Sequence, residues 1–392
     1  MRKGQGMTDS LIAYLAQLIG VSRHYGSDPA FVLAGGGNTS YKTVDRLWVK
    51  ASGHSLATID AGGFVELDRA KLDAMLHATW PADANAREAA FIEAVMASRV
   101  HPELGQRPSV EALLHHLLPS RFVVHTHPGL VNALTCCLKG RELTKELFAD
   151  RVLWQPYVDP GLILAKELAS SINHHRASVG RDPAAIFLAN HGLIVAGDTT
   201  EAIETETAHL VARLQERIDL AGPPTTRPAM TMQTGFLDTY ARALAVERDG
   251  LVAAEDSSAA AAILASTPAL CDIALMGPLT PDQIVYCRSV PIYFESPTTD
   301  MPAAIDQWRG KWDGYVVAYG WEPWVAIIAG AGLIAFRNNA KLSDVTRAVY
   351  TDAARVYDYA RRLGGVRILD VDDRRFIENW EVEAYRRAVM CK

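Results

Sequence analysis

The segment Arg121-Phe122-Val123-Val124-His125-Thr126-His127 is an apolar run that ends in two histidines separated by one residue. Side chains two apart along a β-strand point to the same face, so a strand here would present both imidazoles side by side. A second apolar run, residues 184–189, ends in Asn190-His191-Gly192 and could add a third imidazole. Three neutral imidazoles with an open fourth position are typical of a catalytic rather than a structural zinc site. These two strands therefore predict a metal centre where they end.

An acidic residue precedes the first of these strands. In Pro108-Ser109-Val110-Glu111 the carboxylate stands at the start of an apolar helical pattern, fourteen residues before His125. It could serve as a further metal ligand or as a base. Three imidazoles and one carboxylate together indicate a metal-assisted lyase.

Size and composition restrict the alternatives. The 392 residues suffice for two domains, and 49% hydrophobic with 21% charged residues are typical of a globular protein. The net charge of −6 gives no reason to expect nucleic acid or an anionic membrane as a partner. The longest apolar stretch, Trp324 to Phe336, has 13 residues, which is too short to span a bilayer. Because the N-terminus also lacks the apolar centre of a signal peptide, we expect a cytoplasmic protein that acts on a small molecule.

Two segments rich in glycine and hydroxyl residues lie near the N-terminus, and we expect both to be turns. They are Gly37-Asn38-Thr39-Ser40 and Ser52-Gly53-His54-Ser55. Glycine lets the backbone approach an oxyanion, while N–H and hydroxyl groups donate to it, and Lys42 and Lys50 could add positive charge. Each segment is therefore either an anion cradle or an ordinary hairpin turn, and composition leaves both open. Neither matches a P-loop or a dinucleotide fingerprint.

Helical patterns fill much of the remaining sequence. We expect residues 68–100 to be largely helical and a further helix over residues 159–174. His115 and His116 fall inside the helix that follows Glu111. We expect their side chains to be solvated or capping, without a chemical role.

The segment Gly222-Pro223-Pro224-Thr225-Thr226-Arg227-Pro228 has three prolines in seven residues and is the best candidate for a domain boundary. We expect one domain over residues 1–222 and a smaller α/β domain over residues 232–392. Residues 326–335 align with residues 186–195, and Ala331 falls in the place of His191. The match is short, so a degenerate repeat without metal and a coincidence both remain open.

Several of these segments, in this order, resemble the class II aldolase and adducin head-domain family, which includes fuculose- and rhamnulose-phosphate aldolases and ribulose-phosphate epimerases. The resemblance covers residues 8 to about 220. It rests on Gly37-Asn38-Thr39-Ser40, Ser52-Gly53, Ser109-Val110-Glu111, His125-Thr126-His127, Gln155-Pro156-Tyr157 and Asn190-His191-Gly192-Leu193-Ile194. Residues 277–282 and the tail 380–386 resemble the aldolase part of predicted bifunctional rhamnulose-phosphate aldolase/dehydrogenases. Because the chain stops at Lys392, we expect no dehydrogenase activity.

This resemblance implies a three-layer α/β/α sandwich with a central, mainly antiparallel sheet. It implies that His125, His127 and His191 hold a divalent metal, zinc or another such as manganese. Glu111 matches the acid/base residue, and Tyr157 matches the tyrosine that a neighbouring subunit contributes as a proton donor. The positions that match substrate contacts are Asn38, Thr39, Ser40, Ser52, Gly53 and Ser109.

The implied reaction is reversible aldol cleavage of a ketose, which we expect to be a ketose 1-phosphate. The resemblance also implies that the protein is a homo-oligomer, specifically a tetramer. Two alternatives remain. A sugar-phosphate epimerase can use the same retro-aldol step, but epimerases of this family tend to carry Asp at the position of Glu111. A non-catalytic scaffold like adducin would not need the three metal ligands that this chain keeps.

Overall fold

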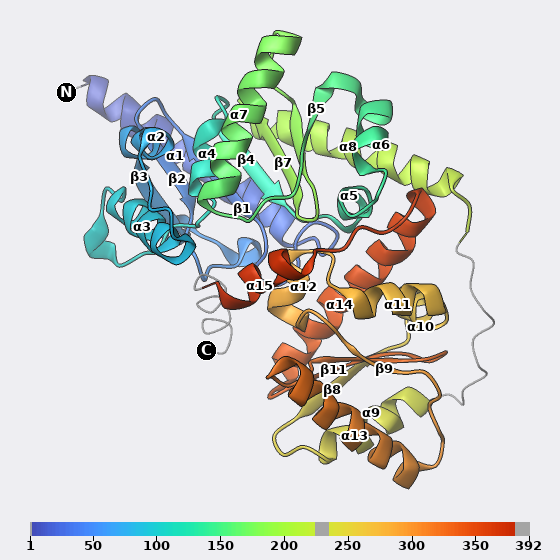
Figure 1. Cartoon of the computed structure of the whole chain (residues 1–392). Helices are drawn as coiled ribbons and strands as arrows, with labels where there is room; N and C mark the ends of the chain where they lie inside the picture. The colour runs from blue at the N-terminus through green and yellow to red at the C-terminus, as the bar shows by residue number, and fades with distance from the viewer. Residues whose placement is uncertain (1, 224–234, 381–392) are drawn as a thin grey trace. The chain divides into compact units, whose positions relative to one another are not determined.

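The computed structural model describes residues 2–223 and 235–380, and the chain divides into two compact units (Figure 1). Unit 1 comprises Met1–Val131 and Arg141–Arg213, and unit 2 comprises Asn132–Gly140 and Leu214–Lys392. Most of the expected proline-rich boundary and the tail after residue 380 lie outside the described residues.

Unit 1 is built on a seven-stranded sheet in the order β3-β2-β1-β4-β7-β6-β5. Strands β5 and β6 pair in parallel, whereas the other neighbours pair antiparallel. The mainly antiparallel central sheet is therefore confirmed. The strands are β1 (Asn38–Lys42), β2 (Arg46–Lys50), β3 (Phe64–Asp68), β4 (Phe122–Thr126), β5 (Val152–Gln155), β6 (Ala185–Leu188) and β7 (Gly192–Gly197).

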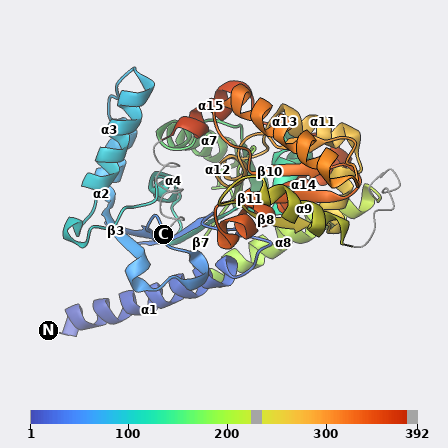
Figure 2. The same ribbon diagram turned by 90° about the horizontal axis from the view of Figure 1, so that it is seen from below.

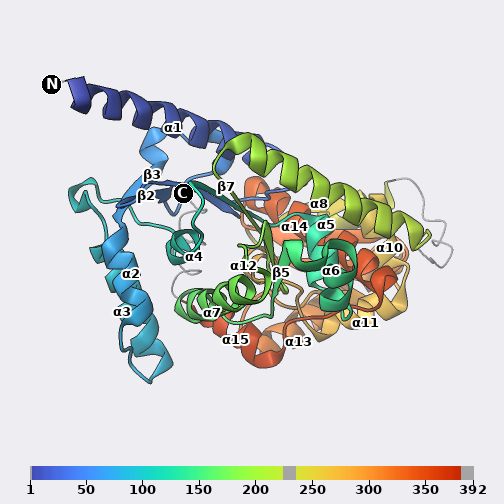
Figure 3. The ribbon, with the colours of Figure 1, turned by 90° about the horizontal axis from the view of Figure 1, so that it is seen from above.

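Helices cover both faces of this sheet, so the three-layer architecture is confirmed as well (Figure 3). Helices α1 and α8 lie along one face, while α2, α4 and α7 lie on the other, and α2 continues directly from the edge strand β3 (Figure 2). The helices that begin in unit 1 are α1 (Arg2–Gly26), α2 (Arg69–His77), α3 (Ala84–Ala97), α4 (Ala112–Leu117), α5 (Gly129–Thr135), α7 (Leu162–Val179) and α8 (Thr200–Leu220), and α6 spans Gly140–Phe148.

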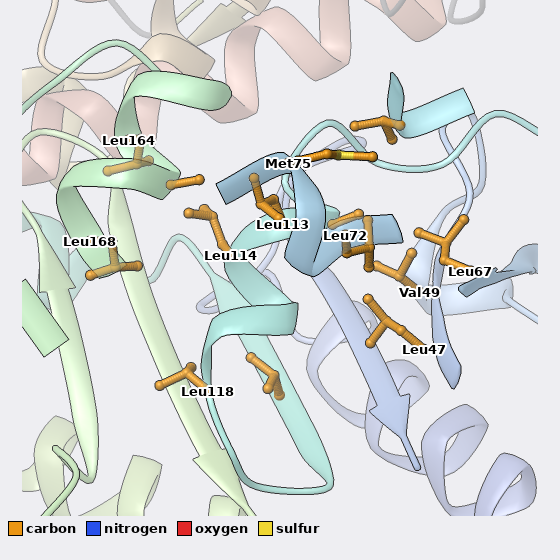
Figure 4. Packing of buried hydrophobic residues seen from close by; sticks show 14 of the residues in the cluster. Leu47, Val49, Leu67, Leu72, Met75, Leu113, Leu114, Leu118, Leu164 and Leu168 are labelled. Atoms are coloured by element: carbon orange, nitrogen blue, oxygen red, sulfur yellow. The ribbon is translucent and has the colours of Figure 1, made fainter. Parts of the chain in front are cut away.

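A continuous apolar layer joins the sheet to the second group of helices (Figure 4). Leu164 and Leu168 lie four residues apart on α7 and so share one helix face, which packs against this layer. Leu113 and Leu114 anchor the short helix α4 in the same layer, at 0% and 2% exposure. Each such side chain contributes roughly 1.5–3 kcal/mol of burial free energy. This packing fixes the position of α4, and hence of Glu111 immediately before it.

Strand β1 corrects one expectation. Asn38, Thr39 and Ser40 were expected in a turn, but they form the start of a central strand that pairs with β2 on one side and β4 on the other. All three side chains are at most 1% exposed. Small polar residues next to glycines usually indicate a turn, but here each polar side chain has a hydrogen-bond partner in the interior.

Unit 2 contains a four-stranded sheet in the order β8-β11-β10-β9, packed around the fully buried Trp308. Its strands are β8 (Val252–Asp256), β9 (Ile292–Phe294), β10 (Val325–Ile328) and β11 (Gly332–Arg337). Its helices are α9 (Phe236–Val246), α10 (Ala259–Ala265), α11 (Pro268–Met276), α12 (Pro281–Cys287), α13 (Met301–Tyr319), α14 (Ala340–Leu363) and α15 (Val371–Asn379). A mixed α/β second domain with a smaller sheet agrees with expectation.

The order β5-α7-β6-β7-α8 of unit 1 recurs in unit 2 as β9-α13-β10-β11-α14. In both, a parallel strand pair is followed by an antiparallel hairpin. The hairpin turns match in detail, because Asn190 and Gly330 both have positive φ, 53° and 71°. The amides of Ala189 and Ala329 each donate to the last carbonyl of the neighbouring parallel strand at 2.9 Å. The short sequence match thus extends to a whole βαββα unit, which favours duplication over coincidence.

Within residues 2–223 and 235–380, we find no single helix with both the length and the apolar character needed to cross a membrane. The bent pair α10 and α11, with 87° between the two helices, passes that test by length and composition alone.

Candidate metal centre

Three histidine side chains converge at the end of strand β4. His125 belongs to β4, His127 follows it, and His191 lies in the turn between β6 and β7. Because His125 pairs with Ile194 across the antiparallel β4–β7 ladder, the turn that carries His191 lies beside the end of β4. The ring centroids are 4.8–5.1 Å apart. One nitrogen from each ring lies within 4.8 Å of the others, so the three side chains could hold a metal ion.

The hydrogen bond of His125 assigns its tautomer. Its Nδ1 lies 2.9 Å from the carbonyl oxygen of Leu193, to which it donates. The Nε2 atom then faces both Nε2 of His127, at 3.0 Å, and Oε1 of Glu111, at 3.4 Å. A histidine whose outer nitrogen is held by a carbonyl is oriented as metal-ligating histidines usually are.

Glycine at position 192 permits this close approach. A Cβ there would lie 2.6 Å from the carbonyl oxygen of Thr126 and 2.7 Å from Cδ2 of His127. A larger residue would push the start of β7 away from the segment that carries two of the histidines. The converging imidazoles fit a divalent cation that takes nitrogen ligands.

Glu111 brings a buried carboxylate to the same place. Its Oε1 lies 3.4 Å from Nε2 of His125 and 3.3 Å from Nε2 of His191, and its side chain is 5% exposed. Burial alone would raise the pKa of this carboxyl group. Attraction to His125, together with hydrogen bonds from His125 and His191, outweighs burial and holds the pKa well below its usual value. Glu111 is therefore ionised in the folded protein.

His191 is affected in the complementary way. Burial lowers its pKa to about 4, although the hydrogen bond and charge of Glu111 act in the opposite direction. The imidazole is consequently neutral near pH 7, which is the form that binds metal ions.

Comparison with known proteins identifies the scaffold that carries this arrangement. The sequence model of the family described as "Class II Aldolase and Adducin N-terminal domain" matches residues 16–217. The chain belongs to the class II aldolase and adducin family. A second model, described as "Aldolase class II, second domain", matches residues 236–386.

Individual relatives of this class II aldolase family member are distant. A curated protein of Bacillus subtilis (strain 168), named "Uncharacterized oxidoreductase YuxG", is 25% identical over 94% of this chain, and the alignment covers 58% of that protein's length. The N-terminal class II aldolase domain of a conserved protein from Thermoplasma acidophilum is 31% identical, with a TM-score of 0.45 over 52% of this chain and 92% of its own. The L-fuculose-1-phosphate aldolase from Thermus thermophilus is 18% identical, with a TM-score of 0.34 over 53% of this chain and 100% of its own.

The remaining residues expected at the active site of this family occupy two places. Ser109 lies beside Glu111, because its hydroxyl accepts from the Glu111 amide at 3.2 Å and lies 3.4 Å from Nδ2 of Asn38. The turn at Ser52 and Gly53 adjoins Ser109, since the Ser52 hydroxyl donates to the Pro108 carbonyl at 3.2 Å. Three separate segments thus meet on the Glu111 side of the histidines.

Thr39 and Ser40 have partners inside the protein. The Thr39 hydroxyl is 2.6 Å from that of Ser22 in α1, on the opposite face of the sheet from α4. Ser40 instead contacts His115 at 2.7 Å. Tyr157 lies two residues beyond β5, and because β5 and β6 run in parallel, it leaves the sheet at the same edge as the turn that carries His191.

His115 and His116 contradict the expectation of solvated side chains, since they are 1% and 8% exposed. The helix that carries them is short and packed against the sheet, so both of its sides are covered. His115 contacts the side chain of Asn38, whose amide in turn donates to Oε2 of Glu111 at 2.5 Å. The interval of four residues between Glu111 and His115, one helical turn, could have revealed this relationship.

Proposed function

We propose that this chain is a metal-dependent aldolase that reversibly cleaves a ketose, with a ketose 1-phosphate as the favoured substrate, into a ketone and an aldehyde. The observation that carries the proposal is the buried, ionised Glu111 placed 3.3–3.4 Å from two of three converging histidine nitrogens. In this proposal His125, His127 and His191 hold a divalent metal, zinc or manganese. When bound, such a cation stabilises the negative charge that develops on substrate oxygens as the carbon–carbon bond breaks.

The proton steps belong to residues of the chain. In the direction of bond formation, Glu111 removes a proton from the donor carbon, which then attacks the aldehyde carbon. Tyr157, contributed by a neighbouring copy in a homo-oligomer, gives a proton to the aldehyde oxygen. In cleavage the same two protons return by the reverse path, so one carboxylate and one phenol account for the balance.

The substrate phosphate would bind on the Glu111 side of the histidines. Ser52, Gly53 and Ser109 come from segments that meet there, and Gly53 has a φ of 89°, in the left-handed region that favours glycine. We assign Asn38 to this site through its hydrogen bond to Glu111. We assign Thr39 and Ser40 to the same site through their neighbours in β1.

The proposed division of labour follows the sequence. Residues 1–222 carry the complete metal site, and residues 232–392 form a domain that binds no metal. The reaction that we propose for this chain is the lyase reaction. Among aldolases, the bifunctional rhamnulose-phosphate class is the group we propose to test first.

A substrate screen tests the proposal. The protein, stripped of metal and then reloaded with zinc or manganese, is incubated with ketose 1-phosphates and free ketoses while aldehyde release is followed. We expect metal-dependent release from at least one ketose, lost on chelation and in Glu111→Gln. Conversion to an isomeric ketose phosphate without aldehyde would instead assign an epimerase. Absence of both turnover and metal binding would assign a scaffold and overturn the proposal.

A further inference from the structure

Strand β1 directs a row of polar side chains toward helix α4. Asn38, Ser40 and Lys42 alternate along the strand and so share one face. Ser40 contacts Nδ1 of His115 at 2.7 Å, and Nζ of Lys42 donates to the His115 carbonyl at 2.6 Å. Asn38 contacts both Nε2 of His115 and the carboxylate of Glu111. All of these side chains are at most 6% exposed, so they form one buried network.

The network has a single consistent direction of donation. A neutral imidazole has one donor and one acceptor nitrogen. Burial, the charge on His125 and the charge on Lys42 lower the pKa of His115 well below its usual value, so its ring is neutral. Nε2 must donate to Asn38, because Oδ1 of an amide can only accept. Nδ1 is then the acceptor for the Ser40 hydroxyl.

The carboxylate of Glu111 independently requires the same orientation of the Asn38 amide, because a carboxylate oxygen accepts and Nδ2 is the donor. With Oδ1 occupied by His115, the Nδ2 group faces Oε2 of Glu111 and donates to it. The opposite amide orientation would place a carbonyl oxygen against an ionised carboxylate. With Oε2 held, the other oxygen of Glu111 faces the histidines.

We propose that His115 is a positioning residue, which sets the Asn38 amide and through it holds Glu111 in the orientation that faces His125 and His191. The effect of His115 on catalysis rests on the catalytic role proposed for Glu111. The effect of His115 on the orientation of the Glu111 carboxylate is independent of that role. Partners that orient the residues around a metal usually contribute about 10- to 100-fold to metal affinity or activity.

Two substitutions of His115 by amide residues distinguish the role of its Nε2 donor from that of its Nδ1 acceptor. Gln can reproduce the donor at the Nε2 position, whereas Asn reproduces the acceptor at the Nδ1 position and is too short to reach Asn38. We expect His115→Gln to stay close to wild type, and His115→Asn and His115→Leu to lose roughly 10- to 100-fold in zinc affinity. His116→Gln is the matched control, because His116 is a buried neighbour that contacts Arg69 instead. Equal losses in the Gln and Asn variants would overturn the proposal.

A double-mutant cycle distinguishes positioning from general support of the fold. If His115 acts through Glu111, then His115→Leu should lower zinc affinity much less in a Glu111→Gln background than in wild type. An equal loss in both backgrounds would show that His115 only supports the fold. Where an aldolase substrate is known, kcat should fall with KM little changed. The affinity measurement needs no substrate, so an incorrect reaction assignment and an incorrect role for His115 are distinguishable.

The metal-free protein gives a direct reading of the tautomer that does not depend on stable variants. Nitrogen NMR of ¹⁵N-histidine-labelled protein should show, among the buried imidazoles, a His115 signal that is protonated on Nε2 and unprotonated on Nδ1 near pH 7. That signal should be absent from His115→Gln and displaced in Asn38→Ala. A proton on Nδ1 with Nε2 unprotonated would reverse the donation to Asn38 and overturn the proposal.

Discussion

Nε2 of His125 and Nε2 of His127 lie 3.0 Å apart at the end of β4, while Nδ1 of His125 is held by a backbone carbonyl. Nε2 of His125 also lies 3.4 Å from Oε1 of Glu111, so it faces both a second imidazole and a carboxylate. Two such nitrogens repel unless a proton or a cation lies between them. His191 contributes a third ring nitrogen at the same place. A metal cation can bind all three nitrogens at once, whereas a single proton can bridge only two of them.

The first prediction concerns this cation. His127→Ala should reduce bound zinc from about one ion per chain to background while the sheet stays folded, since residue 127 lies beyond the last residue of β4. Metal content after gel filtration, with circular dichroism as the check on folding, measures both. His174→Ala, at an exposed histidine, is the control and should keep its zinc. Stoichiometric zinc in His127→Ala would remove that residue from the ligand set.

Gly192→Ala should damage the site by sterics alone. The new Cβ would lie 2.6 Å from the Thr126 carbonyl, and such overpacking costs about 1–3 kcal/mol. Urea unfolding should report that loss, and zinc affinity should fall with it. Gly20→Ala is matched, because its Cβ meets open space and Ala favours a helix. An unchanged Gly192→Ala protein would mean that β7 can move without disturbing the histidines.

Substitution of Ser52 tests the anion site. If the substrate is phosphorylated, the hydroxyl contributes a charge-assisted hydrogen bond of about 1.5–3 kcal/mol. Ser52→Ala should then raise KM for a ketose phosphate roughly ten- to hundredfold, with no such change for the free ketose. Ser55, exposed in the same turn, supplies the control substitution. Equal KM values for Ser52→Ala and wild type would leave this segment as an ordinary turn.

Glu111→Gln separates proton transfer from binding. The amide keeps the size of the side chain but cannot titrate, so metal and ketose should still bind while turnover falls by about 100-fold or more. Exchange of the donor's carbon-bound hydrogen with solvent deuterium isolates the step. Glu103→Gln, at an exposed carboxylate, should exchange like wild type. Wild-type exchange in Glu111→Gln would require another base.

Lys42 should make the free energy of unfolding depend on pH between about 7 and 10.5. Burial, and then the charge of Arg69, lower its pKa to about 7 from 10.5. Between these values the unfolded chain binds a proton that the folded chain has released, so the free energy of unfolding rises with pH. Relative to Lys42→Met, wild type should gain at most about 1.4 kcal/mol per pH unit in this window.

Urea unfolding of wild type and Lys42→Met from pH 6 to pH 10 measures that difference. Lys71→Met is the matched control, since Lys71 also donates to a backbone carbonyl but is exposed. Its stability curve should stay parallel to that of wild type. If the Lys42→Met curve is parallel as well, Lys42 keeps its proton in the folded state.

The convergence of the histidines could be predicted because each one follows from a local pattern. Strand periodicity alone places His125 and His127 on one face. The third, His191, needed only the assumption that two strands ending in histidine are neighbours in the sheet, and the β4–β7 pairing satisfies it.

The surroundings of Glu111 could not be predicted in the same way. They depend on β1 being a central strand, and the pairing of β1 with β4 joins residues more than eighty positions apart. Composition made Asn38 and Ser40 look like turn residues, and the helical pattern gave no indication that His115 would face them. Long-range strand order, rather than local propensity, determines which polar groups become buried neighbours.

The backbone conformation of the hairpin turn is less favourable at Asn190 than at the corresponding residue of the second hairpin, Gly330. An asparagine at a φ of 53° occupies the left-handed region, which costs most residues roughly 1–2 kcal/mol and which asparagine adopts less readily than glycine but more readily than other residues. The second hairpin, which has Ala331 where the first has His191, uses the unstrained residue. Backbone strain is thus present in the copy that presents an imidazole and relieved in the copy that does not. Replacement of Asn190 by Gly would relieve this strain and at the same time loosen the backbone that presents His191.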